Sequence, residues 1–234
     1  MKGFLAVAVY LAALLWLDRY VELPGQLLLG AVTWVALVCA LKAASWELRA
    51  QTLVVVVVAT CGEIVGSIVW GLYTYRLENL PSFVPPAHGL VYLGGFALAR
   101  SLGPRLVPIA LAAVLAWGAA GITVLPRDDL GGALGALVLA LFLLRGRAPA
   151  VYAGVFIVVA GLELYGTWLG TWYWAEVAPG TAITQGNPPS GIASGYVFFD
   201  IAALALAPRL LSLLRGARSR FGLAPPLPDP ARSA

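Results

Sequence analysis

Charge is what this sequence has least of. Of its 234 residues only 11% are Asp, Glu, Lys or Arg, whereas 61% are hydrophobic, and the mean hydropathy is +0.88. Soluble domains are about half apolar and a quarter charged, so this composition excludes an ordinary soluble protein. The net charge of +4 does not indicate nucleic-acid binding, because the basic residues are dispersed around hydrophobic runs. We expect an integral membrane protein that binds no nucleic acid.

Cysteine and histidine are scarce as well. Both cysteines, Cys39 and Cys61, fall within apolar segments, and His88 is the only histidine. The sequence has no CxxC pair, no cluster of metal ligands, no Gly-rich phosphate loop and no Ser/His/Asp arrangement. It therefore does not favour a metallohydrolase, a nucleotide-binding protein or a protease, and we expect no disulfide framework, no metal site and no cofactor.

Long hydrophobic runs predict about eight transmembrane helices. A bilayer core of about 30 Å needs about 20 helical residues, and backbone in lipid must satisfy its own hydrogen bonds. The runs are too long and too uniformly apolar for barrel strands, so we expect an all-α membrane protein. Cut at charges and at Pro/Gly clusters, the runs cover residues 3–21, 25–43, 51–75, 86–101, 104–125, 131–146, 149–174 and 190–214.

The basic residues divide unequally between the two sides that this count of spans defines. Three of them, Arg19, Arg76 and Arg127, fall on one side and twelve on the other. Because basic residues are enriched in cytoplasmic loops, we expect a multi-pass protein of the cytoplasmic membrane with both termini in the cytoplasm. The twelve residues assigned to the cytoplasm are Lys2, Lys42, Arg49, Arg100, Arg105, Arg145, Arg147, Arg209, Arg215, Arg218, Arg220 and Arg232.

Two segments about a hundred residues apart carry the same pattern. When Glu63 is aligned with Glu163, both are followed by small residues and then by an aromatic-x-aromatic triplet, Tyr-Thr-Tyr in one and Trp-Tyr-Trp in the other. A double proline follows in each, at Pro85–Pro86 and at Pro188–Pro189. Small residues at helix contacts and aromatics at the membrane interface explain much of this pattern as architecture.

This pattern predicts an internal repeat. Spans three and four correspond to spans seven and eight, and an even number of spans in each half leaves both halves in the same orientation. We expect two parallel four-helix repeats, residues 1–101 and 102–215, related by an axis along the membrane normal. Residues 216–234 are predicted to be a disordered cytoplasmic tail that contains proline and arginine.

Three acids, Glu63, Glu163 and Asp200, fall inside predicted spans, where no basic residue can neutralise them. An acid at the centre of a span costs about 2.5–3.5 kcal/mol, so such residues face an interior and are functional by default. At 1.5 Å per residue, Glu163 and Asp200 lie at similar depths of about 15–16 Å, where they would share a proton. Alternatively, the glutamates only pin helices together, and His88 is an ordinary interfacial residue.

Aromatic residues surround these acids in the sequence. We expect Glu63, Glu163 and Asp200 to point into one cavity that opens toward the outer side, with His88 as a further catalytic candidate. Trp70, Tyr73, Trp168 and Trp172 are predicted to bound this cavity. The other candidate substrate-binding residues are Tyr75, Tyr92, Trp174, Asn187 and Tyr196.

The first motif resembles the carotenoid-biosynthesis membrane proteins that include bisanhydrobacterioruberin hydratase. The likeness rests on a glutamate followed at short spacing by two glycines and Tyr-x-Tyr, then by a proline-containing loop, and on a late Trp-containing motif, here GTWYW (170–174). It covers spans three, four, seven and eight, about a third of the chain. The sequence departs from that pattern at Trp70, where Phe is usual, and at GNPPSGIASGY (186–196), which replaces a Pro-x-x-Asn-Phe element.

The resemblance implies addition of water to a terminal isoprenoid double bond. Protonating an alkene requires a neutral carboxylic acid in a dry site, and a second carboxylate or His88 would orient the water. We expect an intramembrane enzyme, a hydratase or an isomerase, whose partner is a membrane lipid or isoprenoid small molecule. Two alternatives stay open: a proton-coupled transporter, and a non-catalytic subunit that binds a lipid or a pigment.

Overall fold

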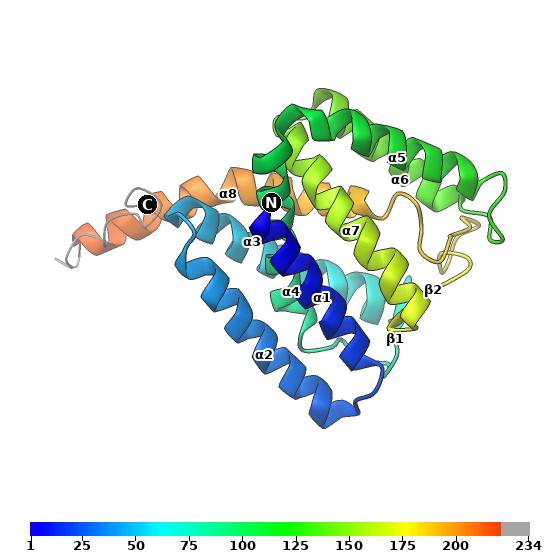
Figure 1. Ribbon diagram of the computed structural model, residues 1–234, viewed down its shortest axis with the longest axis horizontal. Coiled ribbons are helices and arrows are strands. Elements are labelled where there is room, and N and C mark those ends of the chain that lie inside the picture. The colour runs from blue at the N-terminus through cyan, green and yellow to red at the C-terminus, as the bar shows by residue number, and fades with distance from the viewer. Residues whose placement is uncertain (221–234) are drawn as a thin grey trace.

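The computed structural model describes residues 1–220, with side chains through residue 217. Helices form about three quarters of this part of the chain, and one pair of short strands is present (Figure 1). The elements are α1 (Lys2–Asp18), α2 (Leu23–Lys42), α3 (Trp46–Glu63), a π-helical segment (Ile64–Val69), β1 (Tyr73–Tyr75), α4 (Val84–Leu102), a 3-10 turn (Gly103–Arg105), α5 (Leu106–Gly121), α6 (Leu130–Arg145), α7 (Pro149–Leu169), β2 (Trp172–Trp174) and α8 (Ala193–Arg220).

Local sequence signals explain where several helices begin and end. The Ser45 hydroxyl accepts a hydrogen bond from the Leu48 N–H at 3.2 Å and caps α3, and the Asp129 carboxylate accepts one from the Gly132 N–H at 3.0 Å and caps α6. Proline occupies a first-turn position in α2, α4 and α7, where its missing N–H costs nothing. Gly103 has a φ of +57°, a conformation that interrupts the helix between α4 and α5.

Within residues 1–220, five helices are long and apolar enough to cross a membrane, as expected of a mostly helical, membrane-embedded protein. In this count α4 and α5 form one continuous stretch, Val84–Gly121, although Figure 1 shows α5 running in a different direction from α4. With 17 and 16 residues, α1 and α6 are shorter than the other candidate spans. The five helices are Leu23–Lys42, Trp46–Val69, Val84–Gly121, Pro149–Leu169 and Ala193–Ala217.

The predicted spans 51–75 and 149–174 are too long at their outer ends. Helical structure stops at Val69 and at Leu169, and the aromatic triplets that follow are strands rather than helix. Gly71 and Gly170 both have a φ of +75°, a left-handed conformation that ends the helices in the same way. The fold is therefore not purely α-helical.

The two strands pair with each other in an antiparallel register that is symmetric about its centre. Thr74 lies opposite Tyr173, and the two aromatic residues of β1 lie opposite the two of β2 in crossed order. The backbone N–H of Arg76 donates to the carbonyl of Thr171 at 2.9 Å, and that of Ala175 donates to the carbonyl of Leu72, also at 2.9 Å. A twofold axis through the centre would interchange these two bonds.

The π-helical segment explains why the two motifs differ in length by one residue. Eight positions separate Glu63 from Gly71, whereas seven separate Glu163 from Gly170. The chain after Glu63 winds as a π-helix, which accommodates an extra residue, whereas α7 remains α-helical through Leu169. The extra residue is absorbed in the helix, so both triplets still enter the sheet in matching positions.

The core of the fold is the crossing of α3, α4, α7 and α8, with α4 against α7 and α8 against α3. The backbones of α4 and α7 touch at Gly95 and Gly154: a Cβ on Gly154 would lie 2.2 Å from the Gly95 carbonyl oxygen. Such contacts between small residues let transmembrane helices approach closely. Large apolar side chains cover much of the outside, including Val9, Leu28 and Val69, as expected of surfaces in lipid.

The C-terminal boundary differs from the prediction. Helix α8 continues through Arg220, so the start of the tail predicted at 216–234 is helical. The rest of that predicted tail, residues 221–234, lies outside the described residues.

Candidate functional site

A cavity of about 540 Å³ lies where the two strands meet the core helices. Its volume falls within the range of small-molecule sites. Most of its wall is apolar or aromatic. Among the described residues that line it, Glu63 and Glu163 are the carboxylic acids and His88 the one basic side chain, and no lysine or arginine is present.

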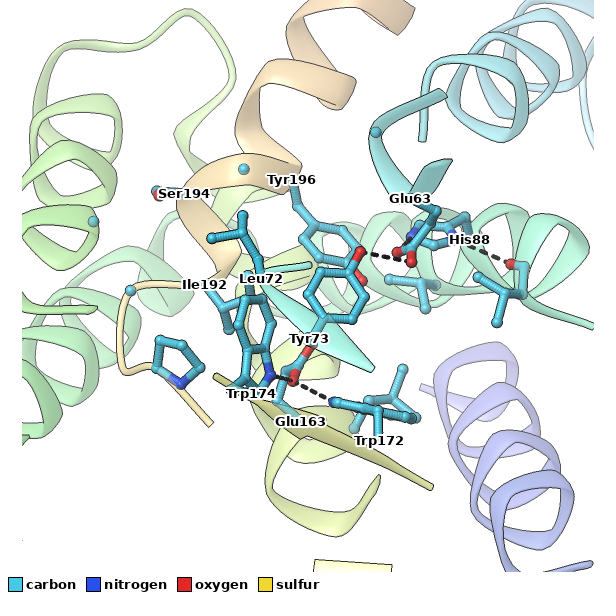
Figure 2. Close-up of a pocket in the computed structure, with 18 of the residues that line it drawn as sticks. Glu63, Leu72, Tyr73, His88, Glu163, Trp172, Trp174, Ile192, Ser194 and Tyr196 are labelled. Atoms are coloured by element: carbon cyan, nitrogen blue, oxygen red, sulfur yellow. Dashed lines mark hydrogen bonds and ion pairs between the residues drawn. The ribbon is translucent and has the colours of Figure 1, made fainter. Parts of the chain in front are cut away.

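Glu63, the last residue of α3, forms a buried polar centre on one side of this cavity (Figure 2). Its Oε2 accepts hydrogen bonds from the hydroxyls of Tyr73 and Tyr75, each at 2.7 Å. Its Oε1 lies 3.2 Å from Nε2 of His88. Both tyrosines belong to β1, so the strand that closes the motif also supplies the donors to its glutamate.

The surroundings of His88 determine how many protons this centre holds. Nδ1 lies 3.0 Å from the carbonyl oxygen of Val84, which can only accept, so Nδ1 carries a hydrogen. Nε2 then faces Oε1 of Glu63, and one proton must lie on one of these two atoms. Neutral acid with neutral imidazole, or carboxylate with imidazolium, both leave the Glu63–His88 pair without net charge.

The two phenols are fixed as hydrogen-bond donors. Burial, and after it the nearby Glu63 carboxylate, raises the pKa of Tyr73 far above its ordinary value. The same two causes raise the pKa of Tyr75. Neither phenol ionises at physiological pH, so both remain able to donate to Glu63.

Glu163, on α7, forms the second centre. Its Oε2 accepts hydrogen bonds from the indole N–H groups of Trp172 at 2.9 Å and Trp174 at 3.1 Å, both on β2. Its Oε1 has no hydrogen-bond partner among the described side chains and backbone. In Figure 2 the ring of Tyr73 lies between the two carboxylates, and it packs against Trp174 with ring centroids 4.5 Å apart.

The two centres differ in their charge compensation. His88 balances Glu63, but no cation within residues 1–217 forms an ion pair with Glu163, which is only 7% exposed. An ionised carboxylate left alone in an apolar cavity is strongly unfavourable. Protonation removes this cost, so burial favours the neutral acid at Glu163. With two N–H donors already on Oε2, its proton would lie on Oε1.

Glycines hold the aromatic donors in place. A Cβ on Gly166 would lie 2.1 Å from the ring of Trp172, and a Cβ on Gly66 would lie 3.2 Å from the ring of Tyr73. Each ring thus lies over the helix turn that follows its glutamate. From the sequence we interpreted the small residues of the motif as helix contacts. In the structure they also leave space for the aromatic rings that donate hydrogen bonds to the glutamates.

Most of the residues predicted for the site do line the cavity. Tyr196, on α8, lies there with its ring stacked on that of His88, at 5.4 Å between centroids. Trp70 lies at the rim, 47% exposed, and its indole N–H donates to the Pro179 carbonyl at 3.0 Å. The predicted residues that line the cavity are Glu63, Trp70, Tyr73, Tyr75, His88, Glu163, Trp172, Trp174 and Tyr196.

Three of the predicted substrate-binding residues do not line this cavity. Trp168 is 75% exposed, because its position on α7 faces away from the interior. The Tyr92 hydroxyl donates to Gln51 at 3.0 Å, within the helix core. Asn187 acts indirectly, since its Oδ1 accepts from the backbone N–H of Trp174 at 2.9 Å and so positions β2.

Asp200 is buried, as expected, but the structure does not place it in the cavity with the glutamates. It lies one turn beyond Tyr196 on α8, and its Oδ2 has no hydrogen-bond partner among the described residues. No hydrogen bond joins it to Glu163 among those of the described residues. Counting residues along the two helices predicted that Asp200 lies at the depth of Glu163, but it did not predict the direction in which α8 turns the Asp200 side chain.

Two buried aspartates escaped the sequence analysis because they lie at the ends of spans. Asp129 accepts backbone hydrogen bonds from Gly132, Gly186 and Ser190 at 2.7–3.0 Å and ties the loop before α8 to α6. Its place before an apolar run is an N-cap signal that was available in the sequence.

Asp18 has the corresponding role at the end of α1. It accepts from the Gln26 amide at 2.9 Å and lies 3.6 Å from the Arg76 guanidinium, in the loop after β1. Arg76 also donates to the carbonyls of Asp18 and Val21. These anchors are positioning groups that hold the loops after β1 and β2 against the helix bundle.

Within the described residues, no group of three or more His, Cys, Asp or Glu side chains could hold a metal ion. Comparisons with known proteins give no relative: no family model matches the chain, and no curated protein or solved structure matches it.

Proposed function

We propose that the chain is an intramembrane enzyme that protonates a double bond of a lipophilic, isoprenoid- or carotenoid-like substrate and thereby hydrates or isomerises it. The observation that carries the proposal is the contrast at Glu163: an acid with no counter-charge, with one oxygen held by two indoles and the other free in an apolar cavity. Such a carboxyl keeps its proton in a site that excludes water, so the proton is available for transfer to an apolar substrate.

The first step is proton transfer from Glu163. The π electrons of the double bond form a C–H bond with the proton on Oε1, and the O–H bond electrons stay on the carboxylate. The Trp172 and Trp174 N–H groups hold that carboxylate as its charge develops. The other alkene carbon becomes a carbocation, which the aromatic walls and the carboxylate stabilise.

The second step decides between hydration and isomerisation. In hydration, a water molecule oriented by the neutral Glu63–His88 pair forms a C–O bond to the carbocation. Its extra proton returns to the Glu163 carboxylate, so the enzyme regains its starting state. In isomerisation, the carboxylate instead removes a proton from a carbon next to the cation and the double bond reforms there.

The proposal includes the architecture around the site. We propose that α1, α4, α5 and α6 each cross the membrane too, which gives eight spans in two parallel repeats with both termini in the cytoplasm. The symmetric register of β1 and β2 supports the repeat, and the unequal distribution of basic residues supports the orientation. Reporter fusions after Arg145 and at the C-terminus should both report cytoplasm, and a periplasmic signal from either would contradict this topology.

The test of function is expression in a host that makes carotenoids, followed by mass spectrometry of extracted lipids. We expect a lipid heavier by one water molecule, or an isomer with altered retention, that depends on the wild-type chain. Glu163→Gln keeps the shape and acceptor oxygen of the side chain but lacks the transferable proton, so the product should disappear while the protein remains in the membrane. Unchanged lipids with the wild-type chain in several such hosts would refute the proposal.

A non-catalytic subunit that binds a lipid or pigment is the second candidate. It is favoured by one observation: both glutamates accept two hydrogen bonds from the strand that follows them, a role that pins β1 and β2 and needs no chemistry. The same expression experiment separates the two functions. A binding subunit would retain its lipid in the Glu163→Gln variant, and no product would form with either chain.

A further inference from the structure

We infer that the cavity is a binding site for one lipophilic cation, such as a tertiary amine or quaternary ammonium on an apolar tail, held between Glu163 and the surrounding aromatic rings. The inference deepens the proposed function and rests on it for the natural occupant, a transient carbocation. Binding of a stable cation is nevertheless measurable without any turnover.

The charges around the cavity leave room for one positive charge. Two acids line it, and within the described residues no lysine or arginine does. His88 compensates Glu63, so that pair is already neutral. When Glu163 loses its proton, its carboxylate becomes the one uncompensated negative charge among the described residues of the cavity. A ligand with a single positive charge would balance that carboxylate.

The aromatic rings supply the second part of a cation site. The N–H and O–H groups of Trp172, Trp174 and Tyr73 are turned toward the carboxylates, and the bodies of their rings line the cavity. Tyr196 lines it from α8. Ring faces attract a desolvated cation, and rings fixed by hydrogen bonds lose little freedom when it binds.

The rest of the cavity explains why the ligand is amphiphilic. Leu11, Leu14 and Leu15 of α1 contribute an aliphatic wall, joined by Phe83 and Val91. An apolar tail would lie along this wall, while the charged group would lie at the glutamates. Because the helices around the cavity are apolar enough to be in a bilayer, such a ligand has a route from the lipid phase.

Binding of a tertiary amine has a balanced proton transfer. The nitrogen lone pair forms an N–H bond with the Glu163 proton, the O–H bond electrons remain on oxygen, and an ammonium–carboxylate pair results. Protonation of an alkene would produce the same arrangement of charge, with carbon in place of nitrogen. An amine is therefore the stable analogue of the species that the proposed enzyme forms.

Two glycines provide a matched pair of variants. The variant at Gly195 reduces the space in the cavity, and the variant at Gly161 adds the same side chain outside it. Gly195, on α8, lines the cavity, and a Cβ there would meet no atom within 4 Å. Gly161, on α7, is equally unobstructed but exposed on the outside and not part of the wall. Gly195→Leu would place an added side chain at the cavity wall, from a position where Cβ itself meets nothing, whereas Gly161→Leu would place the same side chain on the outside.

The experiment measures saturable binding of radiolabelled N,N-dimethyldodecylamine to the full chain in lipid nanodiscs. The control ligand is 2-methyltetradecane, which replaces the nitrogen by carbon. We expect the amine to bind the wild-type chain at least about tenfold more tightly than the hydrocarbon. Gly195→Leu should abolish saturable binding and Gly161→Leu should retain it. Glu163→Gln should weaken amine binding by about tenfold and leave the hydrocarbon unaffected.

Equal affinity for the two ligands, no saturable amine binding by the wild-type chain, or full amine affinity in Glu163→Gln would each overturn the inference. These outcomes are distinct from failure of the proposed function. Amine binding without any lipid product would leave a cation site and remove the enzyme, whereas lipid hydration without amine binding would leave the enzyme and remove the cation site.

Discussion

The Glu63 and Glu163 centres are built on the same backbone and differ in what surrounds the carboxyl. Each glutamate precedes a helix end formed by a left-handed glycine, and each accepts two hydrogen bonds from the strand that follows. At Glu63 the donors are phenols and a histidine balances the charge. At Glu163 the donors are indoles, and within the described residues no histidine forms an ion pair with it. The comparison shows how one scaffold gives a compensated pair and an isolated acid.

Single side-chain identities produce this difference. His88, on α4, lies 3.2 Å from the Glu63 carboxyl, whereas within the described residues no basic side chain forms an ion pair with Glu163. A phenol hydroxyl can accept a hydrogen bond while it donates another, whereas an indole N–H can only donate one. The Glu63 side can therefore orient water, and the Glu163 side can only hold its carboxyl.

The largest effect is expected from exchanging the acids for amides. Glu163→Gln should lower turnover by at least about 100-fold, the usual worth of a general acid, with little change in thermal unfolding. Glu63→Gln should lower hydration less, because it leaves the proton donor intact. The measurement is the rate of product formation per folded protein in membranes. Equal losses in both variants would contradict the division of labour.

Removing His88 should have the next largest effect, on stability. His88→Ile removes the imidazole and leaves Glu63 buried without compensation, at a cost of about 3 kcal/mol. Combining it with Glu63→Gln removes the uncompensated charge, so the double variant should regain most of the lost stability. Unfolding in mild detergent measures both, and a double variant less stable than His88→Ile would show that the pair is not coupled in this way.

The two packing glycines should differ in sensitivity. Gly166→Ala places a Cβ 2.1 Å from a Trp172 ring that its bond to Glu163 prevents from moving, so we expect a loss of about 2 kcal/mol. Gly66→Ala meets the Tyr73 ring at 3.2 Å, and the loss should stay below about 1 kcal/mol. Comparing the unfolding midpoints of the two variants checks this, and the reverse order would count against the observed ring positions.

Alkaline pH should also destabilise the fold, in part through the phenols of the Glu63 centre. The pKa of Tyr75 is raised in the folded chain, so its contribution to stability is complete below pH 10 and is lost as the pH rises above that value, where only the unfolded chain ionises. The free energy of unfolding should fall by up to about 1.4 kcal/mol per pH unit for this phenol. Tyr75→Phe should reduce that slope, and a variant at Tyr173, an exposed phenol on β2, should leave it unchanged.

Much of the candidate site could be predicted from the sequence, because an acid within an apolar run must face the protein interior rather than lipid. Aligning the two glutamates also located the aromatic donors. The strands were not visible, since residues 73–75 and 172–174 stabilise each other only by pairing across about a hundred residues. The π-helical segment and the contact between His88 and Glu63 depend likewise on packing between helices, which periodicity alone does not give.

The proposed chemistry depends most on the protonation of Glu163, and infrared difference spectroscopy tests that directly. The carbonyl stretch of a protonated carboxyl is distinct from the bands of a carboxylate. Subtracting the spectrum of Glu163→Gln from that of the wild-type chain in nanodiscs at neutral pH isolates this one group. We expect the carbonyl band of a protonated carboxyl group in the wild-type chain and its loss in the variant. A difference spectrum that contains carboxylate bands instead would contradict it.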